Sequence, residues 1–505
     1  MNPEPTEPIP GDKGPSSVSE RQRLGWDIRN APKNYIWLIL FQAGSSAFAF
    51  GAVWLITRSI GREGYGAVFA VIAASQIAQI FTNWTTVAVV RFGVDEFIET
   101  ASIARTFWSR LAILVVNIAL LIAIATLWFP LLAEPLRLTP DTFWLVVLHF
   151  AVTALWLHVQ MGLQAAKMLR EQGFLQMVER LIILVGVASL WATASLDIRS
   201  AIIFYIAAPA AMIIVGALVL RSVILTRFTI DTALIRKTLV YSLPLLPYWL
   251  VGYLSGNYID AAFVSKFLST ADLGVYSIAT QINGIALQIP TLANTILFPL
   301  LITQQAEVGK ERSFFFFRHV LPGIVLIWGT GCAALGFAGY YMVPLLFGPA
   351  FNGAALPLWV LLASSVFWIP VAVGYAAFAN ANSATYISLV ASAFSAVANI
   401  ALDIYLIPRY GMAGCAWATF SAYLVTVGVF VMLLNRASSV PVSWSFWAFL
   451  PSTIGAIIIS YFEFPFWAFA GCLIATAVIA LYKRDSLGQM YSFVSGFWRR
   501  ADGTI

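Results

Sequence analysis

The stretch YIWLILFQAGSSAFAFGAVWLIT, residues 35–57, decides the fold class. It carries no charged side chain and is long enough, as an α-helix, to cross a hydrocarbon core of about 30 Å. Similar apolar stretches recur to the end of the chain. Of its 505 residues 60% are hydrophobic and 10% are charged, against about 25% charged in ordinary globular proteins. The sequence therefore predicts an all-α integral membrane protein and not a barrel, whose strands would show alternating segments of about ten residues.

The apolar stretches predict about fourteen transmembrane helices joined by short loops. The predicted spans lie near residues 35–57, 67–90, 109–130, 142–164, 174–195, 201–221, 241–264, 274–300, 319–340, 355–377, 384–406, 413–434, 445–462 and 465–482.

The lysines and arginines fix the expected orientation. With the N-terminus in the cytoplasm, only six of the 29 fall in outer loops: Arg58, Arg62, Arg137, Arg199, Lys266 and Arg409. Positive charge accumulates on the cytoplasmic side of membrane proteins. The distribution therefore predicts that the N- and C-termini are both cytoplasmic. The net charge of +6 belongs to membrane-flanking loops, so we expect no nucleic-acid partner.

The spans divide the chain into two lobes of six helices and a trailing pair. The expected segments are a disordered cytoplasmic tail (1–34), helices 1–6 (35–222), a cytoplasmic linker (223–240), helices 7–12 (241–435), helices 13–14 (436–482) and an amphipathic cytoplasmic tail (483–505). In the last segment, apolar residues recur at helical spacing between basic ends, which is typical of a helix lying in the inner membrane interface.

An internal repeat supports the two lobes. The segment LITRSIGREGYGAVF (55–69) aligns with FVSKFLSTADLGVYS (263–277) at an offset of 208 residues, so that Arg58 meets Lys266 and Gly66 meets Gly274. Six spans per repeat is an even number, which predicts a parallel pseudo-repeat about an axis along the membrane normal.

Motifs for catalysis and metal binding are absent from the sequence. No G-x-x-x-x-G-K-[ST] loop for nucleotide hydrolysis occurs. His149 and His158 are nine residues apart, which is not a metal-ligand spacing on a helix. The three cysteines lie far apart in apolar runs and are expected to pack as small apolar residues. We therefore expect no enzyme, no catalytic residue, no metal site and no cofactor.

Several stretches resemble a known transporter family. They are TRSIGREGYGAVFAV (57–71), VVRFGVDEF (89–97), YIDAAFVSKFLSTADLGVYSIATQI (258–282), LLFGPAF (345–351) and ANIALDIYLIPRYGMAGCAWATF (398–420). Over roughly residues 35–435 the chain resembles the polysaccharide exporters and lipid-linked oligosaccharide (O-antigen type) flippases of the multidrug/oligosaccharidyl-lipid/polysaccharide exporter superfamily. It departs from them at Asp403, where Asn is more usual, and at Cys415, where Ala is usual.

The resemblance implies a flippase for surface polysaccharide synthesis in the inner membrane of a bacterium. Such a protein carries undecaprenyl-diphosphate-linked oligosaccharide, a polyprenyl-diphosphate compound, from the inner to the outer leaflet. Its partners would be this lipid-linked glycan, membrane lipids, and a glycan polymerase with its export machinery. Since each hydroxyl moved into hydrocarbon costs several kcal/mol, about 4–8 on an alkane scale, the sugar needs a polar path while the lipid tail stays in the bilayer.

Polar residues inside or beside the spans are the candidate site. The candidate substrate-binding residues are Arg58, Arg91, Lys266, Gln281, Asn283, Gln288 and Asn399. Asp260 and Asp403 are candidates for binding a coupling ion, because an acid inside a membrane is costly unless it is paired or faces water. His158, Lys167, Glu179 and Arg180 would form an inner vestibule. Structural roles remain open for all of them, as membrane anchors, ion pairs or interhelical hydrogen bonds.

Two other functions are compatible with the sequence. A cation-coupled multidrug antiporter from the neighbouring branch would produce drug sensitivity on deletion and leave surface glycan normal. A membrane glycan polymerase or ligase would leave lipid-linked units in the outer leaflet, but such enzymes usually carry a large outer loop, which this chain lacks.

Overall fold

The fold is described by a computed structural model. It describes residues 18–127, 139–243, 246, 257–308, 314–382, 384, 386–438 and 445–501. Within these ranges the chain forms helices and no strands. Nine of the helices found there are long and apolar enough to cross a membrane. The predicted class, an all-α integral membrane protein, is confirmed.

At two places consecutive helices join at a glycine kink, without a loop between them. Helix α1 (Val18–Ala78) bends at Gly61, where φ is 67°. Helix α17 (Tyr386–Ser438) bends at Gly411, where φ is 61°. A side chain strains the backbone at positive φ, so glycine is the residue that permits both reversals.

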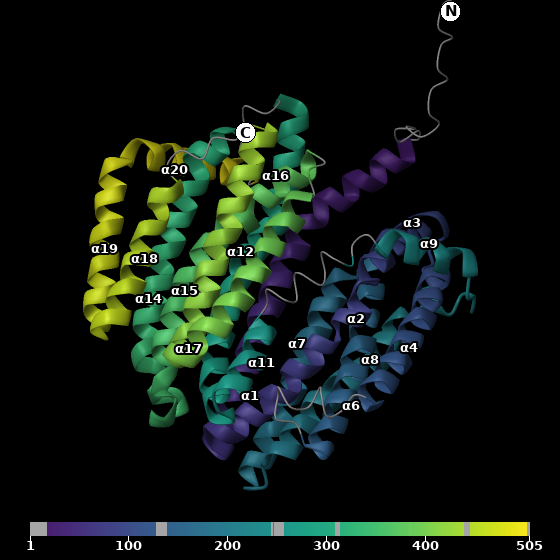
Figure 1. The fold of residues 1–505 in the computed structure, drawn as a ribbon. Helices are drawn as coiled ribbons and strands as arrows, with labels where there is room; N and C mark the ends of the chain where they lie inside the picture. The colour runs from purple at the N-terminus through teal and green to yellow at the C-terminus, as the bar shows by residue number, and fades with distance from the viewer. Residues whose placement is uncertain are drawn as a thin grey trace, which may run out of the picture.

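The helices form two groups, which we call the N-terminal and C-terminal bundles (Figure 1). The N-terminal bundle contains α1, α2 (Ile80–Asn83), α3 (Thr86–Thr100), α4 (Ala104–Leu127), α6 (Pro140–Ala165), α7 (Leu169–Ala192), α8 (Ile198–Ile224) and α9 (Thr232–Ser242). The C-terminal bundle contains α11 (Asn257–Phe267), α12 (Thr270–Val308), η3 (Phe316–Val320), α14 (Leu321–Phe347), η4 (Pro349–Ala354), α15 (Ala355–Pro370), η5 (Val371–Tyr375), α16 (Ala376–Ala381), α17, α18 (Ser445–Phe462), α19 (Pro465–Tyr482) and α20 (Arg484–Ala501).

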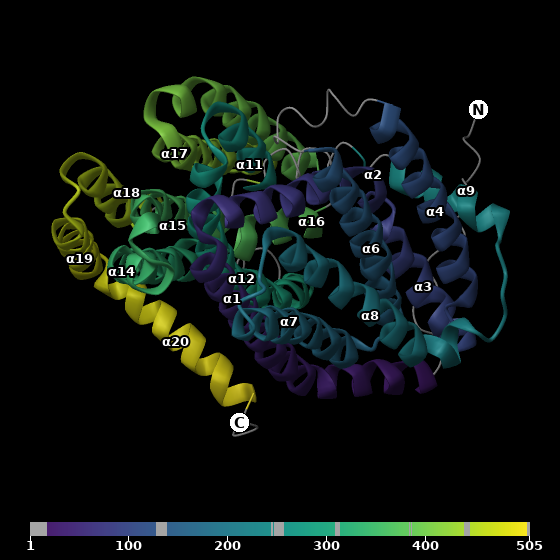
Figure 2. The same cartoon turned by 90° about the horizontal axis from the view of Figure 1, so that it is seen from below.

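Each bundle packs mainly on itself. In the first, α1 packs against α6 and α7, and α6 against α8; in the second, α15 packs against α14 and α17, and α18 against α19. The bundles meet where α1 packs against α11 and α12. Seen along the helices, α1 and α12 lie between the two groups (Figure 2).

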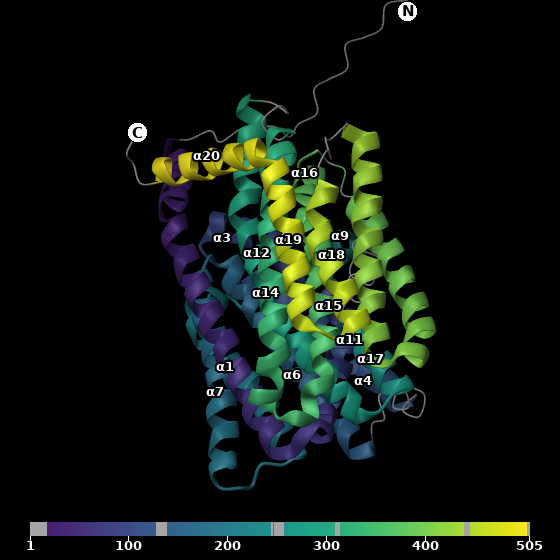
Figure 3. The same ribbon diagram turned by 90° about the vertical axis from the view of Figure 1, so that its left-hand side faces the viewer.

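The two ends of the chain differ in detail from the expectation. Helix α1 already begins at Val18, so residues 18–34 are helical where a disordered tail was expected; residues 1–17 lie outside the described ranges. The sequence Ser17-Val-Ser-Glu20 has the spacing of a capping box, which favours a helix start. The helix expected after residue 483 is present as α20. It lies across the bundle on the same side as the start of α1 (Figure 3).

The repeated glycines mark a close backbone-to-backbone approach of the bundles. A Cβ added at Gly66 would lie 1.9 Å from the carbonyl oxygen of Thr270, and one added at Gly274 would lie 2.0 Å from that of Arg62. Each glycine thus faces the carbonyl four residues before the other. Helices α1 and α12 cross here backbone to backbone, which only residues without a side chain allow.

Candidate functional site

A polar cavity lies between the two bundles, in the middle of apolar helices. Its volume is about 910 Å³, at the upper end of the roughly 300–1,000 Å³ typical of small-molecule sites. The N-terminal bundle lines it from α1, α6, α7 and α8, and the C-terminal bundle from α11, α12, α15 and α17. Water and polar groups are therefore accommodated at a depth where a packed bundle would be apolar.

Two polar stripes face each other across this cavity. On α1, Gln42, Ser45, Ser46 and Ala49 follow the spacing of one helical face, and on α12, Gln281, Gly284, Ile285 and Gln288 do the same. The stripes are hydrogen-bonded: the Gln288 Oε1 accepts from Gln42 Nε2 at 2.9 Å and from Ser46 Oγ at 2.9 Å. The Tyr65 hydroxyl donates to Gln281 Oε1 at 3.4 Å. Amide and hydroxyl groups of this kind can exchange their partners for the polar groups of a ligand.

One wall of the cavity carries a charged pair of neighbours. Glu179 and Arg180 both line it from α7. The Glu179 carboxylate accepts a hydrogen bond from Trp156 Nε1 on α6 at 2.7 Å. Arg180 lies near the middle of its helix, eleven residues from the first, which is about 16 Å along a helix.

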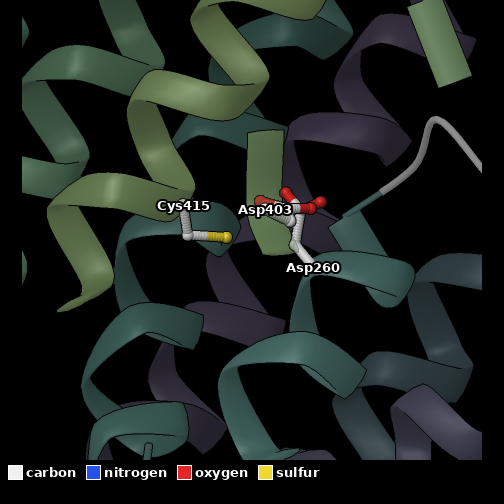
Figure 4. Close-up of side chains that lie close together, drawn as sticks. All are labelled: Asp260, Asp403 and Cys415. Atoms are coloured by element: carbon white, nitrogen blue, oxygen red, sulfur yellow. The ribbon is translucent and has the colours of Figure 1, made fainter. Parts of the chain in front are cut away.

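A second polar site lies in the C-terminal bundle, where α11 meets α17. Asn399 Nδ2 donates to Asp260 Oδ1 at 2.8 Å and to Asp403 Oδ2 at 3.0 Å. The Asp260 Oδ2 accepts from Thr419 Oγ1 at 2.9 Å and from the Tyr276 hydroxyl at 3.3 Å. Figure 4 shows both carboxylates together, with the thiol of Cys415 directed towards them.

The two carboxylates of this cluster have no positively charged partner among the described residues. Asp260 is 1% exposed and Asp403 is fully buried, and neither forms an ion pair within that part of the chain. The Asp403 Oδ1 has no hydrogen-bond partner there. One ligand atom each from Asp260, Asp403 and Cys415 lie within 4.8 Å of one another. Buried carboxylates require a cation, so this cluster can hold a proton or a metal ion, which would have mainly oxygen ligands.

The sequence family of the chain follows from a match over more than half of its length. The family model described as "Polysaccharide biosynthesis protein" matches residues 31–305. The chain belongs to this family.

One curated protein similar to this chain is the probable low-salt glycan biosynthesis flippase Agl15 of Haloferax volcanii. The two are 22% identical over 242 residues, which are 45% of this chain and 50% of the relative. The chain thus matches about half the length of that protein.

Solved structures show the fold. The chain matches the lipid II flippase MurJ in an inward closed conformation with a TM-score of 0.67 and 14% identity, over 89% of this chain and 100% of that one. An inward-facing multidrug resistance MATE family transporter of the MOP superfamily matches with a TM-score of 0.56 and 12% identity, over 80% and 99%. The MATE multidrug transporter DinF-BH, solved with a bound ligand, gives 0.53 and 16%, over 81% and 95%. The chain is therefore a multi-pass membrane protein with the fold shared by these transporters.

The predicted site residues fall in several places. Gln281 and Gln288 line the cavity, as do Glu179 and Arg180. Asn399 lies with Asp260 and Asp403 in the carboxylate cluster, and none of the three belongs to the cavity lining. Asn283 is buried at 1% exposure and is not part of that lining.

Of the residues expected to form an inner vestibule, His158 and Lys167 are not in the cavity lining with Glu179 and Arg180, and neither is the substrate-binding candidate Arg91. Arg91 is exposed and pairs with Asp95 on its own helix at 2.7 Å, so it lies on the surface and not on the cavity wall. His158 is 1% exposed and packs its ring on Phe107 at 4.3 Å between centroids. Lys167 is exposed in the turn after α6. Periodicity could not show this, because burial depends on how neighbouring helices face one another.

Aromatic and hydroxyl groups on the cavity wall were missed in the sequence. They include Tyr205, Tyr258, Trp368, Tyr423 and Thr426. The polar stripe beginning at Gln42 was a usable signal, because four small or polar residues at helical spacing interrupt an otherwise apolar span.

Arg58 and Trp54 connect the bundles at the end of α14. Arg58 donates from Nε to the carbonyl of Leu346 at 2.7 Å and from Nη2 to that of Leu345 at 2.6 Å. The Trp54 Nε1 donates to Leu346 at 2.8 Å. Carbonyls in the last turn of a helix lack intrahelical partners and favour a cation. Arg58 is thus bound to the opposite bundle in this conformation.

We expect Arg58→Gln to loosen this contact. Losing hydrogen bonds from a charged donor at an exposed site should raise labelling of a reporter cysteine on the cavity wall by several-fold, measured with a membrane-impermeant thiol reagent. The matched control is Lys266→Gln, because Lys266 occupies the equivalent repeat position and its side chain forms no hydrogen bond or ion pair with a residue in the described ranges. Equal labelling in the two variants would contradict the role of Arg58.

Proposed function

We propose that this protein is a flippase that moves a polyprenyl-diphosphate-linked oligosaccharide from the inner to the outer leaflet for surface polysaccharide synthesis. The observation that carries the proposal is the polar cavity of about 910 Å³ between two apolar bundles. A sugar chain cannot cross hydrocarbon unaided, because each unpaired hydroxyl costs about 4–8 kcal/mol on an alkane scale. A polar cavity shelters it while the lipid tail stays outside.

The proposed topology has fourteen spans and both termini in the cytoplasm of a bacterium, with the protein in the inner membrane. The lobes comprise residues 35–222 and 241–435, joined by the linker 223–240, which contains most of α9. The start of α1 and helix α20 lie on one side of the bundle, which fits an even number of spans. Alternating access follows from rocking of the lobes about the contact of α1 with α11 and α12.

We propose that a cation bound at Asp260 and Asp403 drives the cycle. The cluster joins α11 to α17, so binding there would stiffen the C-terminal bundle and bias its position. Asn399 and Thr419 hold the carboxylates in place. Consumption of the glycan by a polymerase and its export machinery would add direction.

The test is transport by the purified full-length protein in liposomes. Lipid-linked oligosaccharide is incorporated in both leaflets, and an added glycosidase cleaves the outer-leaflet pool at once. The inner-leaflet pool is cleaved only as the protein moves it across, so wild-type liposomes should lose nearly all of the glycan and protein-free liposomes about half. In cells, deletion of the gene is expected to accumulate undecaprenyl-linked repeat units facing the cytoplasm. Normal levels of these units, already facing outward, would refute the proposal.

A second candidate is a cation-coupled multidrug antiporter, favoured by the fold shared with the MATE transporters. It predicts drug hypersensitivity of the deletion strain with normal surface glycan. The two functions therefore give opposite results in the same pair of strains.

A further inference from the structure

The described lining of the cavity contains a single strong cation. Among these lining residues, Arg180 is the only Lys or Arg. Most side chains of residues 243–257 and 289–308 are not described; the exceptions are residues 243, 246 and 290. The sequence has no Lys or Arg in either stretch. An anionic group that enters the middle of this membrane domain therefore meets one guanidinium in the described part of the wall.

The guanidinium of Arg180 lies within electrostatic range of the neighbouring Glu179 carboxylate, but its hydrogen-bond donors remain available for such a group. It forms no hydrogen bond or ion pair with any residue in the described ranges. Its neighbour Glu179 accepts its hydrogen bond from Trp156, on the α6 side of the helix. A cation near the middle of a span is costly without a partner, and a planar guanidinium suits a phosphate better than any other side chain does.

Two phenols accompany Arg180. Tyr205 on α8 and Tyr258 on α11 line the same cavity and lie within electrostatic range of the guanidinium. A phenol can donate a hydrogen bond to a phosphate oxygen. Because Tyr258 belongs to the other bundle, a phosphate bound by Arg180 and Tyr258 would connect the two bundles.

The opposite wall carries a different chemistry. In the C-terminal bundle, Trp368 and Tyr423 lie on the cavity wall with their rings 5.9 Å apart and tilted by 29°. Their flat faces offer large apolar contacts that suit the C–H face of a sugar ring. The hydroxyls of Ser395 and Thr426 lie on the same wall.

We propose that Arg180 binds one phosphoryl group of the lipid carrier, assisted by Tyr205 and Tyr258, while Trp368 and Tyr423 bind the sugar end. The substrate then spans the bundles, phosphate on the N-terminal side and glycan on the C-terminal side. One guanidinium matches one phosphoryl group, so carriers with a monophosphate and with a diphosphate bind with affinities within about threefold of each other. This inference rests on the proposed function and narrows its substrate class.

The experiment measures binding by the full-length protein in lipid nanodiscs. The probes are undecaprenyl phosphate, undecaprenyl diphosphate, and undecaprenyl diphosphate carrying a disaccharide. Arg180→Gln should weaken the binding of all three by at least about tenfold, the effect of losing a charge-assisted contact in a low-dielectric site. Arg180→Lys should retain part of the affinity, because it keeps the charge but loses the fork geometry. The matched control is Arg221→Gln, at an exposed position in the last turn of α8.

The aromatic pair has a separate readout. Trp368→Ala and Tyr423→Ala should weaken binding of the disaccharide-bearing lipid by about tenfold and leave binding of the two sugar-free lipids within about twofold. A loss that is equal for all three probes would overturn the assignment of the sugar end. Thermal unfolding of each variant shows whether it is folded. If Arg180→Gln does not fold, the binding affinities of Arg180→Lys are used to test the role of Arg180 instead.

Failure of this inference is distinguishable from failure of the function. If the wild type moves lipid-linked glycan in liposomes and Arg180→Gln binds and moves it equally well, the phosphate assignment alone is wrong. If the wild type moves none, the proposed function is wrong, and the binding data still decide whether Arg180 holds a phosphate. A diphosphate carrier that binds more than about tenfold tighter than the monophosphate would overturn the one-phosphoryl prediction.

Discussion

Gly66→Ala is expected to abolish transport and to leave the cavity open at the end of the molecule where α1 and α12 cross. The new Cβ would lie 1.9 Å from the backbone oxygen of Thr270, and a backbone cannot move aside as a flexible side chain can. Relief requires the helices to separate by more than about 1 Å, and overpacking of this kind typically costs roughly 1–3 kcal/mol. Gly274→Ala should have the same effect, because its Cβ would lie 2.0 Å from the oxygen of Arg62.

The measurement combines transport with accessibility. A reporter cysteine at Gln281, on the cavity wall, should be labelled at least about fivefold faster in both glycine variants by a membrane-impermeant thiol reagent added outside. The native cysteines are buried and give little background. Gly331→Ala is the control, since nothing lies within 4 Å of its added Cβ. Wild-type labelling and transport in both variants would show that this crossing does not close the cavity.

The second large effect is expected for Asp260→Asn. The substitution preserves size but removes a charge from a buried cluster, and it replaces an acceptor of three side-chain hydrogen bonds by a mixed donor and acceptor. Removing the carboxylate from a buried contact between a cation and a carboxylate typically costs about 2–5 kcal/mol. We therefore expect the apparent affinity for the coupling cation, and cation-dependent transport with it, to fall by at least about 30-fold.

The test compares transport in liposomes with sodium gradients and with proton gradients of either direction. Wild-type protein should respond to one of the two ions, and Asp260→Asn and Asp403→Asn should respond to neither. Asp141→Asn, at an exposed site in the first turn of α6, should behave as wild type. A variant at residue 260 that kept the full ion response would exclude this cluster from coupling.

The sequence was sufficient for the fold class because its evidence is local. Apolar length alone predicts the membrane helices, and the matched positions Gly66 and Gly274 pointed to the pair that the structure brings into contact. It was insufficient for the joints at Gly61 and Gly411, where two helices meet at a kink. There a glycine replaces the loop that hydropathy leads one to expect.

The candidate site was predicted unevenly for a related reason. Asp260 and Asp403 stood out because a carboxylate in an apolar span is costly anywhere. Their shared partners, Asn399 and Thr419, come from chain segments that only folding brings together. Arg91 and Arg180 look alike in sequence, each beside an apolar run, yet one reaches an acid on its own helix and the other reaches the cavity. That difference depends on helix rotation within the bundle, which periodicity alone does not fix.

Helix α20 packs chiefly on η3, α14 and α19, all in the C-terminal bundle. It will consequently travel with that half of the protein as the halves rock. Energy transfer could be measured between a fluorophore fixed near Leu487 and a second one in the turn at Lys167, in the other half. Their separation would report each turnover of a single molecule in real time, without labelling the transport path itself.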